Sequence, residues 1–276
     1  MTNYSDLSGK VAVVTGSGRR KGLGEAIARK LGSEGCKVVL ADIGQAAGEH
    51  FPESAIGTSD EMEAIAAEMR AEGMEVATSV CNVLVEGDIE NLARFANDTF
   101  GSLDIWVNNA GVGYLMKALV DTEASEWDTV LGVNLRGVFL GIKHAARLMI
   151  KQGSGRIINI GSQASKSAFA EAGAYTTSKH GVVGLTRTAA KELGAHGINV
   201  NAVCPNHVTT GLGAWQNERF ADGDLDRYMA EMRNKIPLGR NGLQEDIAKA
   251  CAFLSSEQSD YITAECMNVS GGEEYH

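Results

Sequence analysis

The sequence predicts an α/β protein in which helices cover both faces of a doubly wound, seven-stranded parallel sheet. Short apolar runs rich in β-branched residues alternate with longer segments of helical periodicity, which is the pattern of successive βαβ units. The runs are apolar almost throughout and do not alternate with polar residues, as expected for strands buried on both faces. No low-complexity linker interrupts the series, so residues 1–276 are expected to form a single domain.

Each predicted strand contains valine or isoleucine and is short enough to cross a sheet once. The strands are expected at Val11–Thr15, Lys37–Ala41, Glu75–Cys81, Ile105–Val107, Arg156–Ile160, Asn199–Val203 and Cys266–Val269. The helices between them repeat apolar residues every three or four positions, as Leu23, Ile27 and Leu31 do. They are expected at Leu23–Ser33, Asp60–Ala71, Val85–Phe100, Ser125–Gln152, Tyr175–Ala195 and Gln244–Ser255.

Two segments depart from this alternation. Gly44–Ser59 follows the second strand, contains Pro52 and is expected to be an insertion loop. Thr209–Pro237 follows the sixth strand and carries aromatic residues, Trp215 among them. A connection of this length is more often an active-site lid than a disordered segment. We therefore predict a substrate lid at residues 209–237, with a purely structural excursion as the alternative.

The composition limits the class of partner. Glycine is abundant, at 33 of 276 residues, while proline occurs only 3 times and 44% of residues are apolar, which excludes a disordered or collagen-like chain. The net charge of −10 argues against a nucleic-acid or anionic-membrane surface, so a small-molecule partner is expected. The five cysteines form no CxxC pair and no metal site is predicted. A polar N-terminus and the lack of long apolar runs predict a cytoplasmic protein.

The glycines concentrate where the first strand meets the first helix, in Thr15–Gly24. In a strand–turn–helix, glycines let the backbone approach a pyrophosphate, and the free N–H groups at the helix N-terminus favour its charge. Asp42 ends the second strand, 18 residues after Gly24, where a carboxylate can bind the adenine ribose and repel a 2′-phosphate. NAD is therefore predicted. Arg19–Lys21 would favour the extra phosphate of NADP, which stays the less favoured alternative.

A second chemical signal lies in Tyr175 and Lys179, which are four residues apart and so share one face of a helix. A phenol is a poor base near neutral pH, but a nearby cation favours the phenolate and lowers its pKa. Such a pair can move a proton to or from a carbonyl or alcohol oxygen while a cofactor moves the hydride.

Several ordered motifs resemble those of the short-chain dehydrogenase/reductase family over nearly the whole chain. They are the glycine-rich turn, Asn108–Gly111, Asn134, Ser162 placed 13 residues before Tyr175, the Tyr175/Lys179 pair, and Pro205 followed by Val208 and Thr210. The resemblance implies a single Rossmann-type domain, in agreement with the predicted sheet.

The resemblance implies that Asn134, Ser162, Tyr175 and Lys179 are the catalytic residues. Tyr175 would be the general acid or base, and Ser162 would hydrogen-bond the substrate oxygen. Lys179 would lower the Tyr175 pKa and bind the nicotinamide ribose, and Asn134 would hold a water of a proton relay. The substrate is expected between Ser162, Tyr175, Phe169, residues 112–115 and Trp215.

The resemblance also places the nucleotide along the carboxyl ends of the strands. Nucleotide contacts are expected from Gly16, Gly18, Leu23, Gly24, Asp42, Ile43, Asn82, Val83, Asn109, Ala110, Gly111, Tyr175, Lys179, Pro205, Val208 and Thr210. Asn108 is expected to be structural.

The sequence departs from the family pattern at four points. Five residues, Ser17 to Lys21, separate Gly16 from Gly22, which is two more than usual, and Gly18 is expected to absorb this bulge. Asn82 replaces the usual aspartate after the third strand, and Asn206 replaces the glycine after Pro205. The insertion at residues 44–59 is expected to fold over the adenosine end of the cofactor and to slow cofactor exchange.

The leading functional prediction is an NAD-dependent oxidoreductase that interconverts a secondary alcohol and a ketone on a small, cyclic or polar organic molecule. A 3-oxoacyl-carrier-protein reductase using NADPH is the alternative within the same chemistry. A nucleotide-sensing protein that keeps the fold without catalysis is the alternative from another class. The resemblance further implies a homotetramer or a homodimer.

Overall fold

The computed structural model describes residues 4–45, 56–113, 116–208 and 224–275. Thr210 and Trp215, two of the predicted site residues, lie outside these ranges, as does the middle of the 44–59 insertion. None of the described helices has the length and apolar character needed to cross a membrane.

The sheet is parallel throughout and has seven strands in the order β3-β2-β1-β4-β5-β6-β7. The bounds are β1 Val11–Thr15, β2 Lys37–Asp42, β3 Val76–Val80, β4 Ile105–Asn108, β5 Gly155–Ile160, β6 Ile198–Pro205 and β7 Cys266–Val269. The predicted strands are thus confirmed to within one residue at each end, except that β6 continues two residues further, to Pro205. The strand order reverses between β1 and β4, and a doubly wound sheet binds its ligands at such a point.

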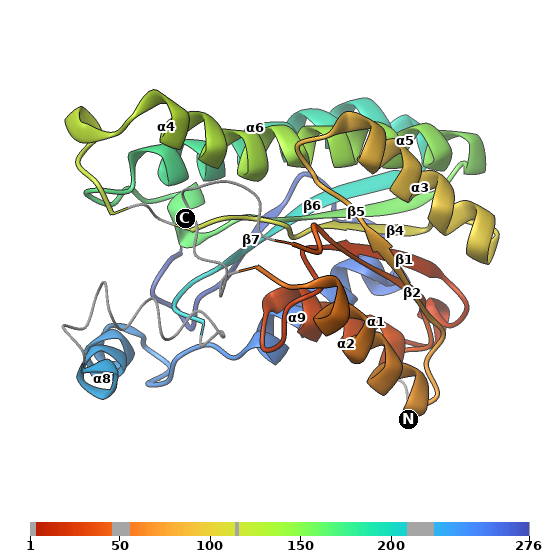
Figure 1. The fold of residues 1–276 in the computed structure, drawn as a ribbon, viewed down its shortest axis with the longest axis horizontal. Coiled ribbons are helices and arrows are strands. Elements are labelled where there is room, and N and C mark those ends of the chain that lie inside the picture. The colour runs from red at the N-terminus through yellow and green to blue at the C-terminus, as the bar shows by residue number, and fades with distance from the viewer. Residues whose placement is uncertain (1–3, 46–55, 114–115, 209–223, 276) are drawn as a thin grey trace.

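Helices cover the two faces of the sheet in separate layers (Figure 1). One layer holds α1 Leu23–Ser33, α2 Ser59–Ala71 and α9 Gln244–Ser255; the other holds α3 Glu86–Phe100, α4 Ala124–Leu131, α5 Gly137–Gln152 and α6 Gly173–Leu193. Each layer buries its own apolar cluster against the sheet, around Ile27 and Leu31 on one face and around Trp106 and Met149 on the other. Burial on both faces explains why the strands read as continuous apolar runs, and the predicted doubly wound fold is confirmed.

Two expectations about helices need correction. The predicted helix Ser125–Gln152 is divided, because a π turn at Gly132–Arg136 separates α4 from α5. The segment predicted as a lid contains an additional helix, α8 Leu225–Lys235, which stands apart from both layers in Figure 1. Its sequence is rich in charged residues, and its apolar residues repeat at helical spacing over one short segment only, so a helix was not predicted there.

Candidate active site

The glycine-rich turn leaves no room for side chains at two of its positions. A Cβ on Gly24 would lie 2.2 Å from the Gly16 carbonyl oxygen, and one on Gly16 would lie 2.7 Å from Ala110 Cα. Gly16 also has a φ of +66°, a left-handed conformation that glycine adopts without strain. The turn therefore brings backbone to backbone, as a cradle for a pyrophosphate requires.

The two extra residues of the turn are held by side chains and not by a flexible Gly18. Gly18 N donates to Asp42 Oδ2 at 2.8 Å, and a Cβ on Gly18 would lie 2.7 Å from Asp42 Cβ. The left-handed residue is Lys21, with a φ of +56°, and its N–H donates to Glu25 Oε2 at 2.7 Å. The expectation that Gly18 absorbs the bulge is thus wrong, because Gly18 is needed for its close approach to Asp42.

Asp42 lies at the end of β2 and faces this turn. Its carboxylate accepts hydrogen bonds from the N–H groups of Gly18 and Ile43, each at 2.8 Å. Burial raises the pKa of Asp42, and these two hydrogen bonds together with Arg19 oppose that rise. The structure thus keeps a carboxylate at the position where the sequence predicts recognition of the ribose.

The segment after β4 supports the glycine turn from the other side. Asn109 Nδ2 donates to the carbonyl oxygens of Thr15 and Gly16 at 2.8 and 2.9 Å, and Ala110 N donates to Thr15 Oγ1 at 3.1 Å. Asn108 is buried, with its side chain bonded to Trp106 and Asn159, which agrees with the structural role expected for it.

Asn82 and Val83 follow β3 and pack into the chain around them. Asn82 Oδ1 accepts a hydrogen bond from Leu84 N at 3.0 Å, and Asn82 N donates to Asp88 Oδ2 at 3.0 Å. A Cβ on Gly137 would lie 3.2 Å from the Val83 Cβ, so Val83 packs closely on the start of α5. Asn82 thus uses its amide oxygen to fix the turn after β3.

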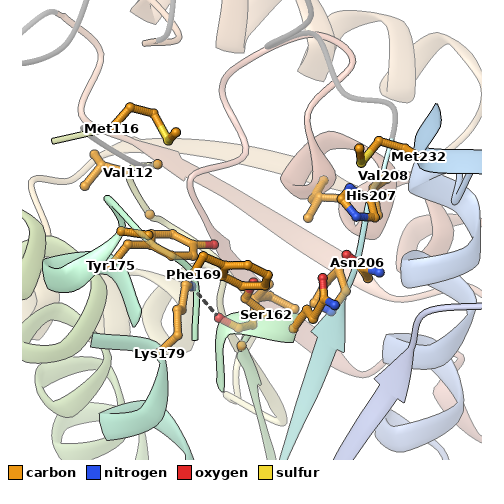
Figure 2. Close-up of a pocket in the computed structure, with 18 of the residues that line it drawn as sticks. Val112, Met116, Ser162, Phe169, Tyr175, Lys179, Asn206, His207, Val208 and Met232 are labelled. Atoms are coloured by element: carbon orange, nitrogen blue, oxygen red, sulfur yellow. Dashed lines mark hydrogen bonds between the residues drawn. The ribbon is translucent and has the colours of Figure 1, made fainter. Parts of the chain in front are cut away.

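The four predicted catalytic side chains come from three parts of the fold. Ser162 follows β5, Tyr175 and Lys179 lie on successive turns of α6, and Asn134 lies in the π turn. Figure 2 shows Ser162, Tyr175 and Lys179 together, across the cavity from His207, Val208 and Met232. The fold therefore brings Ser162, Tyr175 and Lys179 to one cavity, as the sequence motifs predict.

Burial dominates the electrostatics of Tyr175 and Lys179. It raises the pKa of Tyr175, and a hydrogen bond with Ser162 acts in the opposite direction. It lowers the pKa of Lys179 to about 8. Lys179 Nζ donates to the Ile160 carbonyl oxygen at 2.8 Å and lies 5.6 Å from the centre of the Tyr175 ring. The expected depression of the Tyr175 pKa by Lys179 is therefore absent in this structure, because the phenol is desolvated and the ammonium bonds elsewhere.

Asn134 is fully buried and its amide is held on both sides. Oδ1 accepts from Val112 N at 2.8 Å, and Nδ2 donates to the Val112 carbonyl oxygen at 2.9 Å and to Ser178 Oγ at 3.3 Å. A Cβ on Gly111 would lie 3.2 Å from Asn134 Oδ1 and 3.9 Å from Lys179 Nζ, so the amide borders the space beside Lys179. Asn134 lies in the π turn at Gly132–Arg136, and its buried side chain points inward, toward Val112 and Ser178.

Ser162, Tyr175 and Lys179 line a cavity of about 490 Å³ at the carboxyl ends of the strands. Predicted residues on its wall are Leu23, Asn109, Gly111, Val112, Ser162, Phe169, Tyr175, Lys179, Pro205 and Val208. Predicted residues away from its wall are Gly16, Gly18, Gly24, Asp42, Ile43, Asn82, Val83, Ala110 and Asn134, which lie at the nucleotide end or behind the wall. The cavity thus joins the expected nicotinamide and substrate positions in one space.

Several wall residues were not predicted as site residues. They are Met116, Gln163, Ala170, Ala172, Asn206, His207, Tyr228, Met229 and Met232, with Ile160 and Gly161 at the strand end, whereas Gly113 on the same wall falls within the predicted range 112–115. The residues Tyr228, Met229 and Met232 share one side of α8 because they are spaced by one and four positions. That spacing is the one signal that could have identified them.

The C-terminal segment contacts two residues of the cavity wall, Asn206 and His207. Glu273 accepts a hydrogen bond from Asn206 Nδ2, and its carboxylate lies 3.5 Å from His207 Nε2. His207 has a φ of +34°, and burial lowers its pKa. Asn206, which stands in place of the usual glycine, thus anchors this loop to Glu273.

Comparisons with known proteins agree with the geometry. A family model described as enoyl-(acyl carrier protein) reductase matches residues 16–274. The (+)-borneol dehydrogenase 2 of Salvia officinalis is 40% identical over 272 residues, covering 96% of this chain and 89% of that protein. The chain belongs to the short-chain dehydrogenase/reductase family.

Other members of this dehydrogenase/reductase family are also similar. A 3-oxoacyl-acyl-carrier-protein reductase of Staphylococcus aureus is 35% identical, covering 95% of this chain and 97% of that protein. The structure of a gluconate 5-dehydrogenase from Burkholderia cenocepacia, described in complex with NADP and tartrate, matches with a TM-score of 0.85 at 29% identity, covering 98% of this chain and 97% of that one.

Short-chain dehydrogenases and reductases use NAD or NADP, and the residues present fit such a dinucleotide. The lack of room for a Cβ at Gly16 and Gly24 keeps the strand, the turn and the helix N-terminus in the close packing that a pyrophosphate-binding turn requires. Asp42 lies 18 residues after Gly24 and contacts the turn at Gly18, which fits the spacing of an acidic residue that can bind a ribose. The chain is therefore an oxidoreductase of this family.

Proposed function

We propose that this protein is an NAD-dependent oxidoreductase that interconverts a secondary alcohol and a ketone on a compact, largely apolar cyclic molecule. The observation that carries the proposal is the single cavity that joins Ser162, Tyr175 and Lys179 to a wall of apolar side chains. Phe169, Met116 and Met232 belong to that wall, and a compact hydrocarbon skeleton is the complement of such a surface. The similarity to a borneol dehydrogenase supports this choice.

Oxidation of a secondary alcohol removes a proton from oxygen and a hydride from carbon. NAD, when bound, supplies the hydride acceptor. Tyr175 Oη takes the proton of the substrate hydroxyl, and it returns a proton to the carbonyl oxygen in the reverse direction. Ser162 Oγ donates a hydrogen bond to the same oxygen and orients it toward Tyr175.

Lys179 and Asn134 serve the proton that reaches Tyr175. Below a pH of about 8, Lys179 is mainly charged, and the hydrogen bond between Ser162 and Tyr175 opposes the rise in the Tyr175 pKa that burial causes. Asn134 borders the space next to Lys179 Nζ and positions the Val112 backbone there. The pair thereby connects the phenol to a polar exit path for the proton.

The preference for NAD rests on the charges around the glycine turn. Asp42 offers a carboxylate that would repel a 2′-phosphate. Arg20, which could attract that phosphate, forms a bidentate pair with Glu68, with Nη2 2.7 Å from Oε1 and Nη1 3.1 Å from Oε2. These contacts favour the diol of NAD over the phosphate of NADP.

The test is a steady-state screen with NAD⁺ and NADP⁺, read by absorbance of the reduced cofactor. Cyclohexanol, borneol and linear secondary alcohols are the alcohols tested, and an acetoacetyl thioester with NADH and NADPH is the opposing arm. We expect higher kcat/KM with NAD⁺ and with the cyclic alcohols. Faster turnover of the thioester with NADPH would overturn the proposal in favour of a carrier-protein reductase, and binding of NAD without turnover would favour a sensor.

We also propose that the protein forms a homotetramer through α5 and α6. Phe139 and Ile150 on α5 are 45% and 39% exposed, and their spacing of eleven residues places them on one side of the helix. Light scattering after size-exclusion chromatography tests the assembly, and a monomer in solution would refute it.

A further inference from the structure

The enlarged glycine turn and the end of the insertion after β2 are in contact. A Cβ on Gly57, in the last part of the insertion, would lie 2.4 Å from the Gly18 carbonyl oxygen and 2.8 Å from Arg19 N. The insertion is also closed at its base, where Ser59 N donates to the Gly44 carbonyl oxygen at 2.9 Å. The two departures from the family pattern therefore form one contact in space.

This contact places the first turn of α2 on the enlarged glycine turn. Thr58 Oγ1 caps α2 by accepting from Glu61 N at 3.1 Å, and the Glu61 side chain reaches back toward the turn. Glu61 Oε1 accepts a hydrogen bond from Arg20 N at 2.9 Å. Glu61 therefore brings a second carboxylate, besides Asp42, to the residues that surround the expected 2′-position of the ribose.

The three basic residues of the turn differ in what they contact. The Arg20 side chain is paired with Glu68, and the Lys21 backbone N–H donates to Glu25. Within the part of the chain that the structure describes, the Arg19 guanidinium has no hydrogen bond or ion pair. Arg19 is half-buried and interacts electrostatically with Glu61 first and with Asp42 second. Arg19 is thus the cation of the turn that a phosphate could recruit.

We propose that Glu61 is a cofactor-selectivity residue, whose carboxylate offsets the charge of the nearby Arg19 guanidinium and so weakens its attraction for a 2′-phosphate. This inference rests on the proposed preference for NAD. It assigns to the insertion a role in selectivity, because Gly57 and Thr58 set the place of Glu61 on the turn.

The test measures dissociation constants of NAD⁺ and NADP⁺ by isothermal titration calorimetry on the full chain without substrate. E61Q removes the charge and keeps an oxygen that can accept from Arg20 N. Removing the Glu61 charge is expected to tighten NADP⁺ binding by about three- to tenfold and to change NAD⁺ binding by less than about twofold. E63Q is the matched control, because Glu63 lies on the same helix and bonds Arg70 and Thr78 instead of the turn.

A double-mutant cycle with R19Q identifies the path of the effect. We expect the gain in NADP⁺ affinity to vanish in R19Q/E61Q. An unchanged ratio of the two dissociation constants in E61Q, the same gain in E63Q, or a gain that persists without Arg19 would each overturn the inference. Failure of the proposed NAD preference is seen separately, as tighter NADP⁺ binding by the wild-type protein, and the change of ratio between variants still tests Glu61.

Discussion

The nucleotide end and the substrate end of this site are built in different ways. At the nucleotide end, backbone N–H groups of Ser17, Gly18, Arg20 and Lys21 are each held by a partner from another part of the fold. At the substrate end, methionine and phenylalanine side chains from separate elements form the wall. The proposed nucleotide end is thus fixed by backbone hydrogen bonds, whereas the proposed substrate end is lined by adaptable side chains.

The largest expected effect tests the point where the two ends meet. Y175F removes the proton carrier but keeps the ring, so turnover should fall by about 10²- to 10⁴-fold while NAD⁺ affinity is kept. Steady-state kinetics and calorimetry measure the two quantities. Thr177→Ala, at an exposed position on the same helix, is the control. Wild-type turnover in Y175F would refute the proposed role of the phenol.

The rigid construction of the nucleotide end predicts a stability effect. The Cβ of G24A would lie 2.2 Å from a backbone oxygen, so the variant should lose roughly 2–4 kcal/mol of unfolding free energy and bind NAD⁺ poorly. G113A is the matched change on the cavity wall, where a Cβ would meet nothing within 4 Å. Urea denaturation measures both, and equal stability of the two variants would contradict the comparison.

Lys179 should make the protein without cofactor less stable near neutral pH. Its pKa is about 8 when folded and lies higher when unfolded, so the unfolded chain binds more protons between these values. Stability therefore rises with pH above 8, and K179M should be more stable than wild type at pH 7 by roughly 1–3 kcal/mol. The gap should narrow as the pH rises from 8 toward 10. Exposed Lys191 provides the control, since K191M should show no such pH dependence.

The smallest expected effect concerns the adaptable wall. M232A enlarges the cavity and should shift the kcat/KM ratio between borneol and cyclohexanol by about three- to tenfold in favour of the larger alcohol. NAD⁺ affinity should not change. Glu231→Ala, beside it on α8, should leave the ratio as it is. A change in NAD⁺ affinity in M232A would show that the two ends are not separate.

The parts of the fold and site that could be predicted are those with local signals. Apolar runs located all seven strands because burial on both faces leaves few polar positions. The Tyr175/Lys179 pair and Asp42 were located because their chemistry depends on spacing along the chain.

The parts that could not be predicted depend on contacts between distant segments. Glu273 contacts Asn206 and His207, which are more than sixty residues away along the chain, and no sequence pattern near the C-terminus predicts this contact. Glu61 meets the glycine turn, and Gly57 packs on Gly18 nearby, although both are some forty residues away along the chain. The prediction that the Tyr175 pKa is lowered was also wrong, because the sequence shows the neighbouring cation but not the burial of the phenol, which raises this pKa.

The π turn at Gly132–Arg136 makes this site sensitive to the number of residues in a helix and not only to their kind. A π turn accommodates one residue more than an α-helical turn. Deleting a single residue from this turn would let α4 and α5 join as one regular helix, with the composition and hydropathy of the segment almost unchanged. The Asn134 amide would then rotate away from the backbone of Val112. A relative that lacks one residue here would keep the sequence motifs of the fold but not the inward-pointing amide. The number of residues between Glu123 and Gly153 therefore indicates whether a relative retains the same site.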